Sequence, residues 1–236
     1  MKEERFNDDI NHESGNWYFG THRKFLGLAI NNTSGDILEI GSGHFSGSVI
    51  KELVKGTDRK VVSICHEKPY IEELKKDFPD FIYVEVPVDG QQVTLPGGFR
   101  CILGGDDYEE IIFRIRDEYQ KFSVVLIDGG FIPERKKDIV RLRSVTEIFV
   151  VHDTYLSNHP TEDFPEGKTD FEIYDYDPII RSFPYFVEDD LYPYTTITSD
   201  VNTLDFMREE YPLDKYEILY PHNLHTERCR RIKYGN

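Results

Sequence analysis

The sequence predicts an α/β protein with a doubly wound, mostly parallel sheet of seven strands, an antiparallel strand at its edge and helices on both faces. Three observations lead to this prediction. Apolar segments of strand length alternate with segments of helix length from residue 36 to about 155. The most apolar segment, residues 122–130, ends in glycines, as strands covered on both faces often do. The connections are of helical length, which favours parallel pairing.

The first two strand–helix pairs lie in residues 36–78. Residues 36–40 form a short apolar run, and residues 46–55 place apolar side chains at helical spacing. Residues 60–64 repeat the strand pattern, and residues 70–78 repeat the helical one. We therefore expect two parallel strands, each followed by a helix that covers the sheet.

Two further strand patterns follow. Residues 81–88 alternate with period two, and the turn at Asp89-Gly90 predicts a hairpin with residues 91–95. Residues 99–104 form another short strand, which leads into a predicted helix at residues 108–119.

The last two parallel strands end the alternation. Residues 122–130 are the most continuously apolar strand of the chain. Residues 134–144 (ERKKDIVRLRS) are rich in charge and predict an exposed helix. Residues 147–155 then form the fifth strand of the parallel kind.

The two ends of the chain differ from this alternating part. Residues 1–35 are predicted to form a helical cap on the sheet, and residues 36–236 a single compact domain. Residues 158–178 are acidic, contain proline and lack periodicity, which predicts a long surface loop. Three segments are predicted to close the sheet as edge strands, antiparallel to the rest: 194–200, 215–221 and 227–234.

The composition excludes several classes of protein. The 236 residues carry a net charge of −16, and this average field repels a nucleic acid. The three cysteines lie far apart and do not suit a disulfide framework, which favours a reducing compartment. We find no apolar run of about 18 residues and no signal-peptide pattern, so we expect a cytoplasmic protein without a membrane span.

A glycine turn stands between the first strand and the first helix, in the segment ILEIGSGHFSG. Such a turn lets a ligand approach the backbone at the carboxyl end of the strand. A phosphate-binding loop would need a lysine followed by serine or threonine, which is missing at that spacing. A dinucleotide would need a third glycine where Ser46 stands, and Glu39 would repel its pyrophosphate. The acid instead favours a cofactor that carries positive charge.

With its acid and its glycines, LEIGSG resembles the first motif of the class I SAM-dependent methyltransferases, which have a Rossmann-like fold. The resemblance implies S-adenosyl-L-methionine (SAM) as the cofactor. It implies that Glu39 helps to hold the methionine end of SAM, and that Gly41, Gly43 and Ser46 belong to the cofactor-binding turn.

In this family, acids after the second and third strands bind the ribose and the adenine. Cys65 stands near the ribose position here, so the resemblance implies Glu67, two residues later, for that role. For the adenine, the segment GGDDYEE offers Asp106 or Asp107, with Tyr108 against the ring. Capping of the following helix explains one of these two acids equally well.

The segments IDGG and VVHDTY resemble the branch of the family that methylates small hydroxylated molecules and sugars. The resemblance places Asp128, also a cofactor-binding residue, beside Asp153 at the carboxyl edge of adjacent strands. The two carboxylates could bind Mg²⁺ or another divalent cation and so lower the pKa of a substrate hydroxyl. Alternatively, one carboxylate or His152 would act as general base. Unless the strand ends there, only one of His152 and Asp153 is expected to face the ligand.

Two other segments have competing interpretations. Thr21, His22 and Arg23 could reach the cofactor or the acceptor, or could form a helix cap followed by exposed charges. The aromatic and acidic segment 174–194 could stack on sugar rings, or could belong to the edge of the core.

These observations favour an O-methyltransferase whose acceptor is a hydroxyl of a sugar or glycan terminus. The alternatives are a nucleic-acid or cap methyltransferase, which would need a basic groove, and a catalytically inactive protein that binds SAM. The general texture of the sequence, without a particular motif, also resembles glycan methyltransferases of large DNA viruses. No pattern indicates an oligomeric state.

Overall fold

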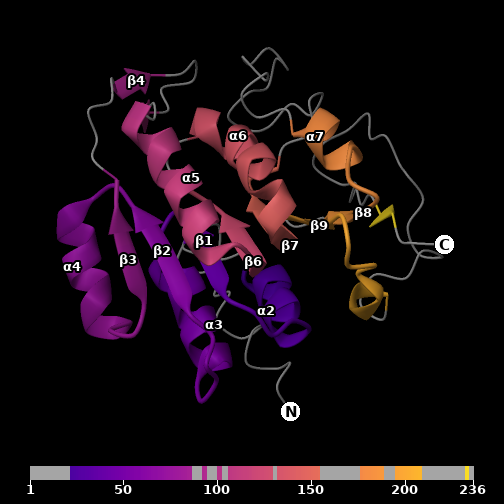
Figure 1. Cartoon of the computed structure of the whole chain (residues 1–236), viewed down its shortest axis with the longest axis horizontal. Coiled ribbons are helices and arrows are strands. Elements are labelled where there is room, and N and C mark those ends of the chain that lie inside the picture. Colours follow the sequence, from indigo (N-terminus) through magenta and orange to yellow (C-terminus); the bar gives the residue numbers. More distant parts are fainter. Residues whose placement is uncertain are drawn as a thin grey trace, which may run out of the picture.

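A mixed β-sheet runs through the protein, with helices on both faces (Figure 1). The computed structural model describes residues 22–86, 92–94, 100–102, 106–129, 132–154, 176–188, 195–208 and 232–233. The sheet has the strand order β10-β8-β9-β7-β6-β1-β2-β3. The predicted fold class is confirmed, and the short strand β10 (Ile232–Lys233) extends the seven expected strands to eight.

Five parallel strands form one half of this sheet, with β1 at the position where the strand order reverses. They are β1 (Ile37–Ile40), β2 (Val61–Cys65), β3 (Ile82–Glu85), β6 (Phe122–Ile127) and β7 (Thr146–His152). Ile37 lies opposite both Val61 and Val124, so β1 is paired on both sides. The carboxyl ends of these strands therefore meet at one edge, where open α/β sheets bind their ligands.

Side chains of each central strand alternate between two separate cores, because neighbours on a strand point to opposite faces. Ile37 packs in one core and Leu38 in the other. One face is covered by α2 (Arg23–Asn31), α3 (His44–Val54) and α4 (Lys68–Asp77). The other is covered by α5 (Asp106–Tyr119), α6 (Ile132–Leu142) and α7 (Asp177–Arg181). Helices α5 and α6 lie side by side across that second face (Figure 1).

The other half of the sheet is antiparallel. Strand β9 (Thr195–Ser199) runs antiparallel to both β7 and β8 (Tyr185–Glu188), and β10 pairs with β8. The strand predicted at 194–200 is therefore confirmed as β9, and the segment 227–234 contributes β10. The strand predicted at 215–221 lies outside the described residues.

The hairpin predicted from residues 81–88 and 91–95 is wrong. Strand β3 pairs in parallel with β2, whereas β4 (Gln92–Thr94) pairs with β5 (Arg100–Ile102) in a separate two-stranded sheet. The third parallel strand is therefore β3 and not the segment 99–104. Strand β3 lies at the end of the sheet, where Ile82 is 40% exposed, and alternation with period two fits such a half-covered edge as well as it fits a hairpin.

Two predicted end segments are described in part. Of the predicted cap 1–35, the structure contains α2, whose Phe25 and Leu26 are fully buried in the core. Of the predicted loop 158–178, the last residues begin α7 instead. Within the described ranges, no helix combines the length and the apolar character that crossing a bilayer requires.

Candidate functional site

The glycine turn after β1 brings two strand ends close together. Gly41 has a φ of +98°, which favours glycine, and a Cβ at this position would lie 2.4 Å from the Cα of Gly129. The N–H of Gly41 donates to the carbonyl of Ile64 at 3.0 Å. Gly43 is the N-cap of α3, so this helix begins at the carboxyl edge of β1. The turn thus presents bare backbone beside the start of a helix.

Glu39, the acid of the predicted motif, is only 1% exposed. The hydroxyls of Ser46 and Ser63 each donate to one of its carboxylate oxygens. The Ser42 and Ser63 hydroxyl oxygens lie 2.6 Å apart, which extends the network. Burial raises the pKa of Glu39 from 4.5 to about 7, although the two serine hydrogen bonds act in the opposite direction. Glu39 is therefore a buried acid with neutral partners.

Asp128 and His152 meet where β6 and β7 end. Ile127 lies opposite Val151 in the parallel register, so the next residues of the two strands come side by side. His152 Nδ1 lies 2.8 Å from Asp128 Oδ1. The two strands therefore present a hydrogen-bonded carboxylate–imidazole pair at the carboxyl edge of the sheet.

Asp153 lies immediately after the end of β7 and has a φ of +56°. The alternation of side chains does not continue through such a left-handed residue, because the strand has ended. His152 and Asp153 consequently line the same cavity, with His152 Nδ1 3.6 Å from Asp153 Oδ1. Because β7 ends at His152, both His152 and Asp153 can face a ligand.

A buried arginine of α6 connects the two carboxylates. Arg135 is 5% exposed, and its Nη1 lies 3.0 Å from Asp153 Oδ2. Its Nη2 lies 3.6 Å from Asp128 Oδ1. Its Nε donates to the carbonyl of Gly129 at 2.7 Å. Asp128, Arg135, His152 and Asp153 thus form one charged cluster.

His22 contacts this charged cluster from the start of α2. It is 2% exposed, and its Nδ1 lies 3.6 Å from Asp128 Oδ2. Its ring meets that of His152 edge to face, with centroids 4.9 Å apart, and neither of its nitrogens has a hydrogen-bond partner in the described part of the chain. His22, Asp128 and His152 bring three possible metal-ligand atoms within 4.8 Å of one another. The interpretation of His22 as one of a run of exposed charges is therefore wrong.

The charged cluster sets the protonation of its members. Burial alone would raise the pKa of Asp128, but His152, His22 and Arg135 hold it well below its ordinary value. Burial alone would lower the pKa of His152, but Asp128 and Asp153 outweigh it and raise the pKa above the ordinary 6.5. Burial lowers the pKa of His22 to about 4. At neutral pH Asp128 is therefore ionised and His22 is uncharged.

The glycine turn and the charged cluster line one cavity of about 500 Å³, a size typical of small-molecule sites. Seven of the predicted site residues line it: Gly41, Gly43, Ser46, Glu67, Asp128, His152 and Asp153. Cys65, His66 and Tyr70 complete the side nearest the end of β2. Glu39 is not part of the lining and contacts it through Ser46.

Of the residues predicted to bind adenine, Asp107 and Tyr108 do not line this cavity. Asp106 is the first residue of α5, and Asp107 is exposed in the first turn. Tyr108 is buried and donates to the carboxylate of Asp138, so its hydroxyl does not face a ligand. Acids in the first turn of a helix interact favourably with its dipole, which agrees with the capping interpretation.

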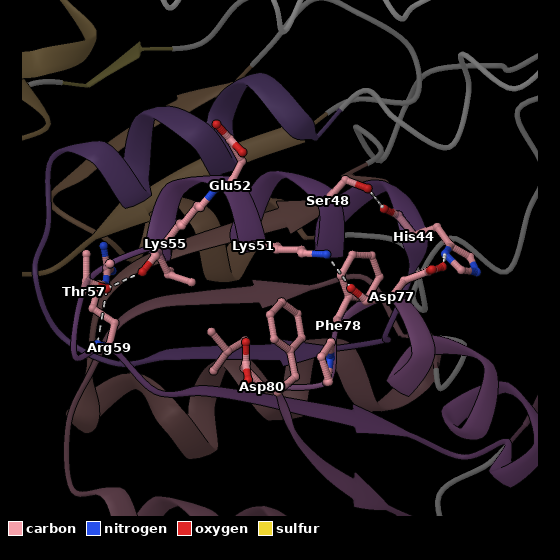
Figure 2. Close-up of a pocket in the computed structure, with 15 residues that line it drawn as sticks. His44, Ser48, Lys51, Glu52, Lys55, Thr57, Arg59, Asp77, Phe78 and Asp80 are labelled. Carbon is pink, nitrogen blue, oxygen red and sulfur yellow. Dashed lines mark hydrogen bonds and ion pairs between the residues drawn. The ribbon is translucent and has the colours of Figure 1, made fainter.

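A second cavity, of about 760 Å³, lies between α3 and the connection from α4 to β3 (Figure 2). Two of its cations, Lys51 and Arg59, already have partners within the fold. Lys51 donates to the carbonyl of Asp77 at 2.7 Å, and its ammonium lies 5.7 Å from the centre of the Phe78 ring. Arg59 donates to the carbonyls of Gly35 and Ile30 at 2.6 and 2.8 Å. These contacts hold neighbouring segments together and do not indicate a ligand.

No protein-family model matches the sequence, and no curated protein is similar to it. Several solved structures are similar in fold. An O-methyltransferase from Bacillus cereus in complex with SAH is 14% identical, with a TM-score of 0.50 over 76% of this chain and 80% of that one. A putative caffeoyl-CoA O-methyltransferase from Staphylococcus aureus is 13% identical, with a TM-score of 0.50 over 75% and 81%. A putative O-methyltransferase from Klebsiella pneumoniae is 10% identical, with a TM-score of 0.51 over 76% and 80%.

The chain shares the fold of these three structures. In this fold the cavity lies at the carboxyl edge of the parallel strands, beside the position where the strand order reverses. At the observed identities, the similarity concerns the arrangement of strands and helices, and the chemistry must be argued from the side chains.

Sequence analysis missed one residue of the site, Arg135. The helix predicted at 134–144 was expected to be exposed, and this is wrong for one of its faces. Arg135, Asp138, Ile139 and Leu142 are all buried. Their spacing of three and four residues places them on one face of α6. This spacing is visible in the sequence, but two charged members of the set hide it from a search for apolar residues.

Proposed function

We propose that this protein is a SAM-dependent O-methyltransferase that transfers a methyl group to a hydroxyl of a sugar or glycan terminus. The observation that carries the proposal is the single cavity lined by both the glycine turn and the Asp128–His152 pair. The turn suits a cofactor, and the pair suits removal of a proton from an acceptor. The O-methyltransferase fold supports the same conclusion.

The residues at the cofactor side of the cavity fit SAM. Gly41 and Gly43 leave the backbone accessible at the start of α3, where the helix favours the carboxylate of an amino-acid group. Glu67 stands two residues after β2, at the N-cap of α4, and would bind the ribose hydroxyls. Glu39 would act on the ammonium group through its charge, because its carboxylate does not reach the cavity. Bound SAM would supply an electrophilic methyl group.

Asp106 or Asp107 remains the prediction for the adenine amine, although Asp107 does not line the cavity. Strand β5, which precedes them, does not belong to the main sheet, so the argument that placed them at a strand end no longer applies. Their assignment rests on the resemblance alone.

His152 is the proposed general base. Its Nδ1–H donates to Asp128, which fixes the tautomer, and Nε2 would accept the proton of the acceptor hydroxyl. Asp128 is ionised and stabilises the imidazolium that forms. The raised pKa of His152 makes it a stronger base. The imidazole therefore takes the proton, and Asp128 acts through the imidazole.

The Asp128–Asp153 pair does not suit a divalent cation. Mg²⁺ needs carboxylate oxygens free for a compact octahedral shell. The guanidinium of Arg135 already lies 3.0 Å from Asp153 and 3.6 Å from Asp128, so it occupies oxygens of both carboxylates and offsets part of their charge. The proposed reaction therefore contains no step that depends on Mg²⁺ held by these two residues.

The polar lining around His152 supports a hydroxylated acceptor. His22, Arg135 and Asp153 provide donors and acceptors at that end of the cavity. A net charge of −16 disfavours a nucleic acid as acceptor. The aromatic segment 174–194 does not support stacking on a sugar ring in its described part, because Tyr176, Phe183 and Phe186 pack in the core.

The test is transfer of label from SAM to a panel of mono- and oligosaccharides and capped RNA, with and without EDTA. We expect label in a saccharide, no effect of EDTA, and a loss of about 10²–10⁴-fold in the His152→Ala variant. Label that enters only the RNA would contradict the acceptor class. No thermal shift with millimolar SAM would contradict the cofactor and favour a protein that has lost catalysis.

A further inference from the structure

Two carboxylates converge at the place where the sequence predicts a divalent cation. Asp128 and Asp153 both approach His152 Nδ1, at 2.8 and 3.6 Å. Converging carboxylates in a largely buried site repel each other unless a positive charge lies close to both. In this chain a side chain supplies such a charge.

Arg135 is held in this position by three acceptors. Its Nε donates to the carbonyl of Gly129 at 2.7 Å, and its Nη1 donates to the carbonyl of His152 at 3.3 Å and to Asp153 Oδ2 at 3.0 Å. Because the guanidinium is planar, these bonds also fix the direction of Nη2. No described residue accepts a hydrogen bond from Nη2, although Arg135 lines the cavity and is 5% exposed. The side chain therefore keeps unused donors at the wall of the cavity.

We propose that Arg135 takes the place of a divalent cation in this protein. Its single positive charge lies between Asp128 and Asp153 and offsets part of their negative charge, and its Nη2 donates a hydrogen bond to the oxygen of the acceptor. The second part rests on the proposed function. A fixed guanidinium performs two tasks of a metal in such a site, since it orients an oxygen and stabilises negative charge that develops on it. Asp153 is then a positioning residue for Arg135, neither a metal ligand nor a base.

One other arrangement of the same side chains would hold a cation. His22, Asp128 and His152 have possible ligand atoms within 4.8 Å of one another, and His22 lacks a hydrogen bond among the described residues. However, Asp128 Oδ1 is already 2.8 Å from His152 Nδ1 and 3.6 Å from Arg135 Nη2. A cation bound there would lie next to the guanidinium and be repelled by it. If Arg135 takes the place of the cation, the unmodified protein should bind a divalent cation weakly. If the two histidines and Asp128 hold a cation, it should bind one tightly.

The experiment measures binding of Mn²⁺ by electron paramagnetic resonance or calorimetry, after treatment with a chelator and dialysis. It compares the full chain with the Arg135→Ala and Arg135→Lys variants. We expect weak binding by the unmodified protein and by the Lys variant, which keeps the positive charge. The Ala variant should bind one Mn²⁺ at least about tenfold more tightly, because two carboxylates are left without their cation. Addition of Asp153→Asn to the Ala variant should remove this gain.

A second readout is guanidinium itself. At low millimolar concentration, it should raise the melting temperature of the Ala variant without affecting that of the unmodified protein. It should also restore part of the methyl transfer that the Ala variant loses. If the Ala variant does not fold, Arg135→Met removes the charge while keeping most of the side-chain volume, and it takes the same measurements.

Tight binding of Mn²⁺ by the unmodified protein, abolished by His22→Ala, would overturn the proposal and assign a metal to the two histidines. A charge-removing variant that gains neither Mn²⁺ nor a response to guanidinium would overturn it as well. Both readouts are independent of SAM and of the acceptor. A gain of Mn²⁺ affinity in a protein that methylates no saccharide would therefore contradict the proposed function and leave intact only the first part of the proposal, that Arg135 takes the place of a cation beside the two carboxylates.

Discussion

Two acids stand at the carboxyl ends of neighbouring strands, Glu39 on β1 and Asp128 directly after β6, yet their pKa values move in opposite directions. Burial pushes the pKa of both upward. Glu39 has only the hydroxyls of Ser46 and Ser63 as partners, and the effect of burial on its pKa is the larger one, so the pKa rises. Asp128 has His152, His22 and Arg135 as partners, and together they outweigh burial, so its pKa falls. The charge of the partners, and not the depth of burial alone, decides the state of a carboxylate at this edge.

The comparison also separates two tasks. An acid that stays ionised beside a histidine can orient that ring and stabilise its charged form. An acid with a pKa near neutrality, held by hydroxyls, changes its charge when a cation arrives or when the pH changes. We therefore assign proton transfer to the Asp128 side and the response to the charge of the cofactor to the Glu39 side.

The largest expected effect comes from removal of the charge of Asp128. Asp128→Asn leaves Arg135 and His152 without one of their buried partners, and we expect the free energy of unfolding to fall by about 3–5 kcal/mol at pH 7. Methyl transfer should fall about 10²–10⁴-fold, because His152 loses the group that orients it. Urea unfolding and initial rates provide the measurements. Asp58→Asn is the control, since Asp58 is exposed and should change stability by less than about 0.5 kcal/mol.

The backbone contact that joins the two regions gives the next largest effect. Gly41→Ala places a methyl group 2.4 Å from Gly129 at a φ of +98°, and should destabilise the fold by about 3 kcal/mol. Gly43→Ala is the matched control, because its added Cβ would meet only Ser46 Oγ at 3.5 Å. It should cost less than about 1 kcal/mol. Equal losses in urea unfolding for the two variants would contradict the close approach of the turn to Gly129.

The Glu39 side is tested by the pH dependence of stability. The pKa of Glu39 rises from 4.5 to about 7 on folding, so the folded state binds the proton more tightly than the unfolded chain does. Its contribution to stability is complete below pH 4.5 and is lost as the pH rises through 7. At 1.36 kcal/mol for each pH unit, this loss is about 3 kcal/mol. Glu39→Gln lacks this titration.

We therefore expect the free energy of unfolding of Glu39→Gln, relative to that of the unmodified protein, to increase by about 3 kcal/mol between pH 4.5 and pH 8. Urea unfolding of both proteins at the two pH values measures this difference. Other groups that titrate in this range are present in both proteins and cancel. A constant difference would show that Glu39 is ionised throughout this pH range.

Much of the parallel half of the fold could be predicted from the sequence. The strands β1, β2, β6 and β7 are mostly apolar, and apolar runs of this length joined by helical segments are typical of a parallel sheet with covered faces. Strand β3 was assigned to a hairpin because period two fits an edge strand of either direction. Strand β8 was not predicted, because the sequence from Tyr185 to Glu188 lies in a region rich in aromatic and acidic residues.

The parts of the site that short sequence motifs form could be predicted from the sequence. The glycine turn and the two strand ends lie in contiguous motifs, so Gly41, Gly43, Asp128, His152 and Asp153 could be placed together. Burial of Glu39 could not be foreseen, because it depends on Ser63 of another strand and on Ser46 of a helix. The position of Arg135 depends on which face α6 presents to the sheet. The glycan acceptor and the viral resemblance remain predictions.

The smallest effect expected concerns the base, and it separates the roles of the two acids beside it. His152 must be uncharged to accept a proton, so methyl transfer should rise with pH through its pKa, which Asp128 and Asp153 hold above 6.5. Asp153→Asn removes one of these charges and should move this acid limb to lower pH by about one unit. Asp153→Glu keeps the charge and serves as the control. The measurement is the rate at saturating SAM between pH 5 and 9. A limb that stays in place in the Asn variant would mean that the base is not His152, or that Arg135 fully screens Asp153 from it.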